Sequence, residues 1–157
     1  MARLSNIHHN VAAFLDMLAV SEIGARMLKE SDDGYNVIVG GGRFDSYATH
    51  PRKLIEVRPG LKSTAAGRYQ LLARYYDPYK SLLGLPDFSP ESQDAIAIQQ
   101  IKERRAIPLI EMGHFTDAVN ACKNIWASLP GAGYGQRENA IAGLRMAYTS
   151  SGGTLIA

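Results

Sequence analysis

The chain has 157 residues, of which 46% are hydrophobic and 20% are charged, with 17 Lys and Arg against 15 Asp and Glu. This composition is typical of a folded globular protein and excludes an intrinsically disordered chain. The near balance of charges argues against a nucleic-acid-binding protein, which normally carries a concentrated basic stripe. The length suits one ordinary domain, so we expect residues 1–157 to fold as a single unit.

The sequence favours synthesis in the cytosol. Cys122 is the only cysteine, so an internal disulfide bond is impossible and folding does not need an oxidising compartment. Near the N-terminus, Asn6, His8, His9 and Asp16 interrupt the apolar residues, which therefore lack the continuous core of a signal peptide. No stretch approaches the ~20 apolar residues that a membrane span requires.

The first predicted element is an amphipathic helix. Its apolar residues follow the i, i+3, i+4, i+7 pattern, at Val11, Phe14, Leu15 and Leu18. Asn6 and Asn10 are the candidate N-caps. The pattern ends at Glu22, and the Asp-Asp-Gly sequence at 32–34 then indicates a turn.

The next segment has the composition of a small sheet. β-Branched residues occupy 37–39, glycines at 40–42 provide a flexible turn, and Phe44 and Tyr47 resume an extended pattern. We expect residues 34–60 to form a small, irregular sheet lobe.

Helical spacing returns after this lobe and ends at Gly84. The apolar face of this helix is predicted from Tyr69, Leu72, Tyr76, Tyr79 and Leu83. Ser89 as N-cap, Pro90 in the first helical position and Glu91 in the first turn predict a further helix.

The last third of the chain is predicted to be helical as well. Pro108 and Gly113 limit a short helix followed by a turn. A helix is expected from residue 115 through Trp126, then a loop, and a final helix over residues 137–149. One helix, a strand-rich insert and several further helices predict an α+β protein with two lobes and a cleft between them.

Glu22 is the leading candidate for chemistry because it lies where the first helix meets the sheet lobe. A carboxylate near a helix C-terminus meets the unfavourable end of the helix dipole, so stability does not explain its position. Val20 and Ile23 could desolvate the carboxyl and raise its pKa into the range useful for proton donation. The alternative is an ordinary acid facing solvent.

Other candidate sites are weaker. The glycines at 40–42 and 131–135 lack the strand–GxGxxG–helix order of a dinucleotide site, and the four histidines lack metal-ligand spacing. We therefore expect neither a metal nor a cofactor.

Asp32, Asp33 and Asp45 could face Glu22 across the cleft, although acids beside glycine turns usually form the turn. Tyr134 and Gln136, in a loop with little packing reason for them, suit stacking and hydrogen bonding to sugars.

Six stretches of the chain, in order, resemble one family. They are FLDMLAVSE, GYNVIVGGGRF, HPRKL, LKSTAAGRYQLL, DFSPESQDAIAIQQIKER and NIWASLPGAGYGQ, spanning residues 14–136. Together they closely resemble the lambda-type phage endolysins, which are lytic transglycosylases with a lysozyme-like fold. The resemblance implies cleavage of the β-1,4 bond between N-acetylmuramic acid and N-acetylglucosamine in peptidoglycan, with formation of a 1,6-anhydro sugar.

The resemblance also implies which residues act in catalysis and substrate binding, and where in the host cell the protein works. Glu22 of the Ser-Glu pair is implied to be the single catalytic acid, which needs no second carboxylate because the muramic C6 hydroxyl attacks. Substrate-binding residues are implied at Ser63, Thr64, Tyr69, Gln70, Tyr134 and Gln136. A phage endolysin of this kind would accumulate as a monomer in the host cytoplasm and reach the wall after a separate holin permeabilises the inner membrane.

Two other functions remain open at this point. A hydrolytic muramidase would use Asp45 or a neighbour as a second acid and would release reducing ends. A non-catalytic glycan-binding module would bind the wall without cleaving it.

Overall fold

The structure is a computed structural model that describes residues 1–133 and 138–157. Over these residues it contains seven helices and one two-stranded antiparallel sheet, so the predicted α+β class is confirmed. In chain order the elements are α1 (His9–Ile23), α2 (Ala25–Glu30), β1 (Ile55–Arg58), β2 (Leu61–Ser63), α3 (Ala73–Leu83), α4 (Pro90–Glu103), α5 (Ile107–Glu111), α6 (Phe115–Cys122) and α7 (Ile141–Ser150).

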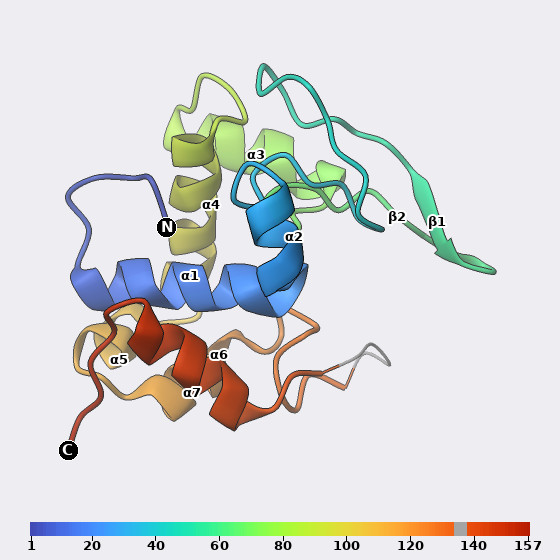
Figure 1. The fold of residues 1–157 in the computed structure, drawn as a ribbon. Coiled ribbons are helices and arrows are strands. Elements are labelled where there is room, and N and C mark those ends of the chain that lie inside the picture. Colours follow the sequence, from blue (N-terminus) through green and yellow to red (C-terminus); the bar gives the residue numbers. More distant parts are fainter. Residues whose placement is uncertain (134–137) are drawn as a thin grey trace.

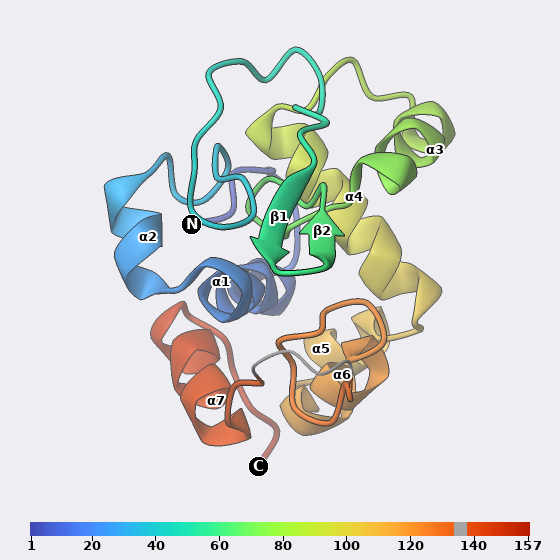
Figure 2. The ribbon, with the colours of Figure 1, turned by 90° about the vertical axis from the view of Figure 1, so that its right-hand side faces the viewer.

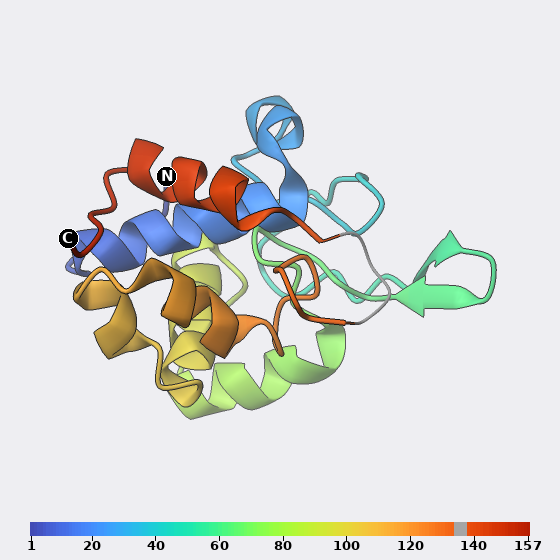
Figure 3. The same cartoon turned by 90° about the horizontal axis from the view of Figure 1, so that it is seen from below.

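Helix α1 runs through the middle of the molecule, with α4 on one side and α5, α6 and α7 on the other (Figure 1). From Ala13 to Ala19 every residue of α1 is buried, because apolar neighbours surround the helix rather than cover one stripe. Figure 3 shows α7 lying alongside α1. The larger core cluster forms around α1, with side chains from these surrounding helices.

The N-terminal cap of α1 differs from the prediction. The predicted caps Asn6 and Asn10 are wrong, because the Nδ1 atom of His8 accepts the N–H of Asn10 at 3.1 Å. Asn10 lies inside the helix, where its amide donates to the carbonyl of Ile110 at 3.1 Å. At the other end Gly24, with φ of +88°, turns the chain out of the helix two residues after Glu22.

The sheet is displaced relative to the prediction. Residues 37–39 form only isolated bridges, of Val37 with Arg43 and of Ile38 with Ala66. The hydrogen-bonded strands are β1 and β2, and β2 lies beyond the expected boundary of the lobe at residue 60. These strands are mostly exposed, so they lack the alternation of buried and exposed residues that identifies a strand in sequence. The hairpin projects from the body of the molecule (Figures 1 and 3).

Several helix boundaries also shift. Helix α3 begins at Ala73 rather than Tyr69, because Gln70 has φ of +53° and Leu72 is extended. Helix α6 ends at Cys122 rather than Trp126, and α7 begins at residue 141. The Ser89 cap, the short α5 and the left-handed Gly84 cap are confirmed.

A buried carboxylate joins the lobes near α4. Asp94 is fully buried and accepts the hydroxyls of Tyr35 at 2.9 Å and Tyr69 at 2.6 Å. It also accepts the backbone N–H groups of Arg3 at 2.7 Å and Leu4 at 2.9 Å. Four donors from three distant segments therefore converge on one side chain, which offsets the cost of burying its charge.

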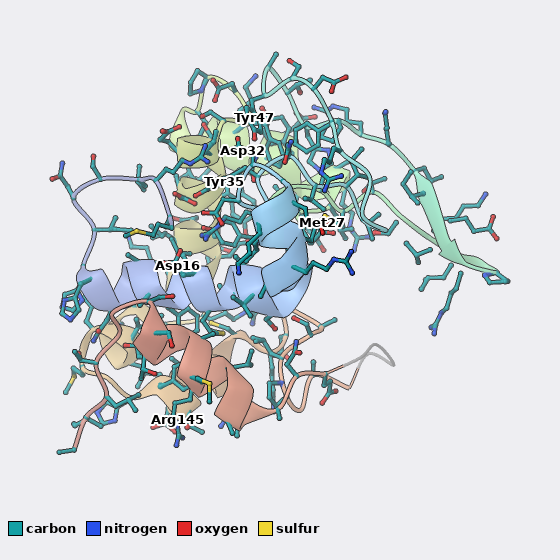
Figure 4. The ribbon with its side chains drawn as sticks, viewed as in Figure 1. Asp16, Met27, Asp32, Tyr35, Tyr47 and Arg145 are labelled. Atoms are coloured by element: carbon teal, nitrogen blue, oxygen red, sulfur yellow. The ribbon has the colours of Figure 1, made fainter. Side chains whose placement is uncertain are left out.

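Arg68 extends this network toward α1. Its guanidinium, 1% exposed as a residue, donates to Asp16 of α1 at 2.8 Å and to the hydroxyl of Tyr69 at 3.0 Å. Figure 4 shows Asp16 on α1 and Tyr35 in the lobe above it. The same figure shows Asp32 beside Tyr47, whose hydroxyl donates to the Asp32 carboxylate at 2.5 Å.

Among the described residues, no helix is both long and apolar enough to cross a membrane.

Asp94→Ala is expected to lower the free energy of unfolding by roughly 3–5 kcal/mol, because it leaves buried donors without an acceptor. Denaturant titration would measure the change. Asp77→Ala is the matched control, since that exposed carboxylate pairs with Arg52 on the surface and should change stability by less than about 1 kcal/mol. Equal effects of the two substitutions would contradict the importance of the Asp94 network.

Candidate active site

Glu22, in the last turn of α1, lines a cleft of about 610 Å³. The hairpin and the segment around Trp126 form the walls of this cleft. Figure 2 views the molecule from the side on which the hairpin and the C-terminal end of α1 lie. Eight of the fourteen described lining residues are apolar, namely Val39, Val57, Leu61, Ala65, Leu72, Ile125, Trp126 and Ala127. The structure therefore places Glu22 at the predicted junction of helix and sheet lobe.

Burial raises the pKa of Glu22 to about 7, and a hydrogen bond from the Ser128 hydroxyl, 3.1 Å from Oε1, opposes this rise. A carboxyl group with this pKa holds its proton near neutral pH and can donate it. Val20 and Ile23 do not line the cleft. Val20 borders a separate cavity beside Asp16 and Arg68, whereas most residues that line the cleft with Glu22 come from distant segments of the chain.

Glu22 is the only acid among the described residues that line this cleft, and the undescribed positions 134–137 contain no Asp or Glu. Asp32 is engaged by Arg3 and Tyr47, and Asp33 lies in the cavity beside Arg68. Asp45 is exposed and does not line the cleft. A second carboxylate facing Glu22 is thus missing from the described part of the cleft.

The other charges of the cleft are positive. Arg58 and Lys62 of the hairpin line it, which favours the approach of an anionic polymer. In the described part of the chain, no three His, Cys, Asp or Glu side chains come together as metal ligands.

The polar residues predicted for substrate binding lie at different depths. Ser63 and Gln70 line the cleft. The side-chain amide of Gln70 donates to the carbonyl of Gly67 at 2.9 Å, which holds it in place. Thr64 does not line the cleft, because its hydroxyl accepts the N–H of Ala73 at the start of α3. Tyr134 and Gln136 lie outside the described residues.

Tyr69, predicted on the cleft wall at a helix start, does not line the cleft that contains Glu22, but it does line the cavity that adjoins this cleft. It precedes α3, and its phenol points into the core, where it donates to Asp94. Its backbone carbonyl accepts the indole N–H of Trp126 at 3.1 Å. Tyr69 therefore supports the cleft from behind, by holding Trp126 in position.

The residues that the sequence reasoning missed are Trp126 and Ser128. Trp126 was expected to be part of a helix, whereas it follows the end of α6 and forms a wall of the cleft. It is the only tryptophan of the chain, and a Leu-Pro-Gly sequence follows it closely. This loop-forming sequence is the one feature from which a binding residue outside a helix could have been predicted. The contact of Ser128 with Glu22 joins residues 106 positions apart, and no local pattern reveals it.

A second cavity, of about 400 Å³, adjoins the first. The two share the wall formed by Gln70, Leu72, Ile125, Trp126 and Ala127. The second cavity continues between α3 and α4, past Tyr75, Tyr79 and Gln100 and the charged residues Arg74, Glu103 and Arg104. Together the cavities form an elongated site with aromatic rings and amides, which suits a linear polar polymer better than a compact metabolite.

A mainly helical body, a small hairpin and a glutamic acid at the cleft between them define an α+β protein of the lysozyme-like class. The chain belongs to the endolysin family, whose model, described as Endolysin, matches residues 12–155. The resemblance seen in the sequence is thereby confirmed.

Relatives of known name agree with this assignment. The endolysin of Escherichia phage lambda is 55% identical over 150 residues, covering 95% of each chain. The endolysin of Escherichia phage P2 is 49% identical over 159 residues, covering 94% of this chain and 96% of that one.

Solved structures confirm the lysozyme-like fold. Bacteriophage lambda lysozyme complexed with a chitohexasaccharide is 53% identical and has a TM-score of 0.93, covering 98% of this chain and all of the other. A further structure of the lysozyme from bacteriophage lambda is 52% identical and has a TM-score of 0.89, with the same coverage.

The raised pKa of Glu22 predicts a pH-dependent cost in stability. Between about pH 4.5 and 7 the folded protein retains a proton that the unfolded chain has released. The free energy of unfolding therefore falls as the pH rises through this window. Glu22→Gln removes the titration, so its stability relative to the native protein should increase by about 3 kcal/mol from pH 4 to pH 8. Denaturant titrations at both pH values measure this difference, and a pH-independent difference would contradict the raised pKa.

Proposed function

We propose that this chain is a peptidoglycan-degrading endolysin that acts as a lytic transglycosylase. Its reaction would cleave the β-1,4 bond between N-acetylmuramic acid and N-acetylglucosamine and form a 1,6-anhydromuramic product. The observation that carries the proposal is the single desolvated carboxyl of Glu22, in a cleft whose described lining contains no second acid.

The substrate class is supported by both the relatives and the cleft. The lambda lysozyme, 53% identical to this chain, has been solved with a chitohexasaccharide, a linear chain of six sugars. The two connected cavities here offer a comparably elongated site, with Trp126 on their shared wall and Gln70 beside it. Aromatic faces stack on sugar rings, and amides exchange hydrogen bonds with sugar hydroxyls.

The proposed reaction uses one carboxyl twice. Neutral Glu22 donates its proton to the glycosidic oxygen as the bond from that oxygen to the muramic C1 breaks. The resulting carboxylate then accepts the proton of the muramic C6 hydroxyl while the C6 oxygen bonds to C1. Glu22 regains its proton and no water is consumed. Attack by a group within the same sugar also avoids the entropic cost of bringing in a second molecule.

The alternatives receive less support from the site. A hydrolytic muramidase of the usual two-carboxylate type requires a second acid about 5–9.5 Å from the first. Asp45, the candidate for that function, does not line the cleft. Glu103 lines the adjoining cavity rather than the cleft at Glu22, and its carboxylate accepts the hydroxyl of Tyr79 at 2.6 Å. A non-catalytic glycan-binding module gives no reason to keep a carboxyl group desolvated at a cost in stability.

The cellular setting belongs to the same proposal. The chain would work as a single catalytic domain and a monomer, without nucleic acid or cofactor. It would accumulate in the host cytoplasm and reach the wall after a separate holin opens the inner membrane. A functional dependence on the holin requires no physical contact between the two proteins.

Digestion of purified peptidoglycan followed by mass spectrometry tests the chemistry. We expect muropeptides lighter by one water than hydrolysis products and without a reducing end. Glu22→Gln should lower the rate by at least about 10²-fold, since the amide cannot donate a proton as an acid does.

Asp45→Asn is the matched control. It also removes one carboxylate, but one outside the cleft, so the rate should stay within about twofold of the native rate, as expected for a surface substitution away from the site. Reducing-end products, together with a large loss in Asp45→Asn, would overturn the proposal in favour of a muramidase. Wall binding without any cleavage would favour a binding module.

A further inference from the structure

A chain of hydrogen bonds leads to Glu22 from the segment before α7. The Nδ2 atom of Asn139 donates to Ser21 Oγ at 3.1 Å. Ser21 Oγ lies 2.7 Å from Ser128 Oγ, and Ser128 Oγ donates to Glu22 Oε1 at 3.1 Å. The four side chains come from the end of α1 and from two positions far along the sequence.

The amide of Asn139 has only one orientation that fits its surroundings. Nδ2 also lies 3.2 Å from the carbonyl oxygen of Ser21 and 3.4 Å from that of Ser128. A flipped amide would place its oxygen against these two carbonyl oxygens, with no hydrogen between them. Nδ2 therefore faces Ser21, and the amide acts there as a donor.

The ionised carboxylate sets the direction of the chain, and the amide of Asn139 matches it. A carboxylate only accepts, so Ser128 Oγ gives its one hydrogen to Glu22 Oε1. The short contact between the two serines is then completed when Ser21 donates its hydrogen to Ser128 Oγ. Ser21 Oγ has lone pairs left, and it accepts from Asn139 Nδ2.

This direction determines which oxygen of Glu22 carries the proton. Oε1 accepts the Ser128 hydroxyl when the carboxyl is ionised, and it continues to do so in the neutral acid as long as Asn139 and Ser21 keep their hydrogens directed toward Ser128. A proton on Oε1 would point at the hydrogen of Ser128, so the neutral acid keeps its proton on Oε2.

We propose that Asn139 and Ser21 are positioning residues that act through Ser128 to hold the Glu22 proton on Oε2, the oxygen that serves as donor to the substrate. This inference rests on the proposed function of Glu22 as the acid. It adds that the proton is delivered from a specified oxygen, whose identity is set by an amide three hydrogen bonds away.

The neighbouring backbone keeps the amide in register. The N–H of Asn139 donates to the carbonyl of Ser128 at 2.8 Å, so the donor and the last hydroxyl of the chain belong to one hydrogen-bonded pair of residues.

The charged groups in the described lining of the cleft are Arg58, Lys62 and Glu22 itself.

Asn139→Asp is the decisive variant, because an ionised carboxylate only accepts. Ser21 would then donate to residue 139 and accept from Ser128, and the lone pairs of Ser128 would face Glu22. The acid would turn its proton toward Ser128. At pH 5, where Glu22 is protonated, we expect kcat to fall about tenfold or more with KM little changed.

Epistasis separates this mechanism from a general effect of charge. Ser128→Ala should lower kcat to a similar extent, and its pH limit on the alkaline side should move to higher pH, since a donor to the carboxylate is lost. With Ser128 absent the direction of the chain has no effect. Asn139→Asp should therefore cause no further loss of kcat in the Ser128→Ala background.

Two further variants complete the test. Ser21→Ala should lower kcat and Ser21→Thr, which keeps the hydroxyl, should restore it. Asn120→Asp, an exposed substitution on α6, is the matched charge control and should leave kcat unchanged. Thermal unfolding confirms that each variant folds. If Asn139→Asp fails to fold, the Ser21 pair alone decides.

The inference is overturned if folded Asn139→Asp keeps native kcat, if its loss multiplies with that of Ser128→Ala, or if Ser21→Ala is as active as the native protein. Product masses from the native enzyme report separately on the proposed function. Reducing-end products would reject the transglycosylase chemistry, while the kcat pattern would still decide how Glu22 is oriented.

Discussion

Asp94 is the constraint on which the cleft depends. By accepting four donors in the interior, this carboxylate fixes the start of the chain, Tyr35 and Tyr69 relative to α4. Tyr69 can then present its backbone carbonyl to the indole of Trp126, and Trp126 forms the wall shared by both cavities. The shape of the cleft beside Glu22 thus depends on a polar group in the core.

Asp94 and Glu22 are two acids with opposite solutions to the same problem of lost solvation. Asp94 is surrounded by donors, which compensate the loss of water around the carboxyl. Among the described residues, the side-chain donor to Glu22 is Ser128, and burial favours the neutral form of this acid. The first arrangement stabilises the fold, while the second sacrifices stability near neutral pH for a proton that can be transferred. This difference in donor number distinguishes the structural carboxylate from the reactive one.

Sequence patterns predicted what depends on neighbours along the chain. The periodicity of α1, the Ser89 cap and the Gly84 terminus each follow from residues within one or two turns, and the position of Glu22 at the end of α1 follows with them. The resemblance to endolysins added the fold and the importance of Glu22. The exposed hairpin escaped prediction, because strands without a buried face carry no alternating pattern.

The surroundings of Glu22 could not be predicted in the same way. Val20 and Ile23 are its neighbours in sequence, but Trp126 and Ser128 reach it through the fold. Tyr69 is predicted at the start of a helix because its spacing continues α3, whereas the left-handed Gln70 interrupts the helix and the phenol of Tyr69 donates to buried Asp94. Contacts of this kind depend on tertiary packing, and local propensity does not specify them.

The bond between Asn139 N–H and the carbonyl of Ser128 also bears on how such proteins diversify. It closes the intervening segment at its base, so that the two ends are joined regardless of what lies between them. Because the entropic cost of loop closure grows slowly with length, insertions there cost little. The length of chain between these two residues can therefore change at little cost in stability, provided that Leu129 keeps its place in the core.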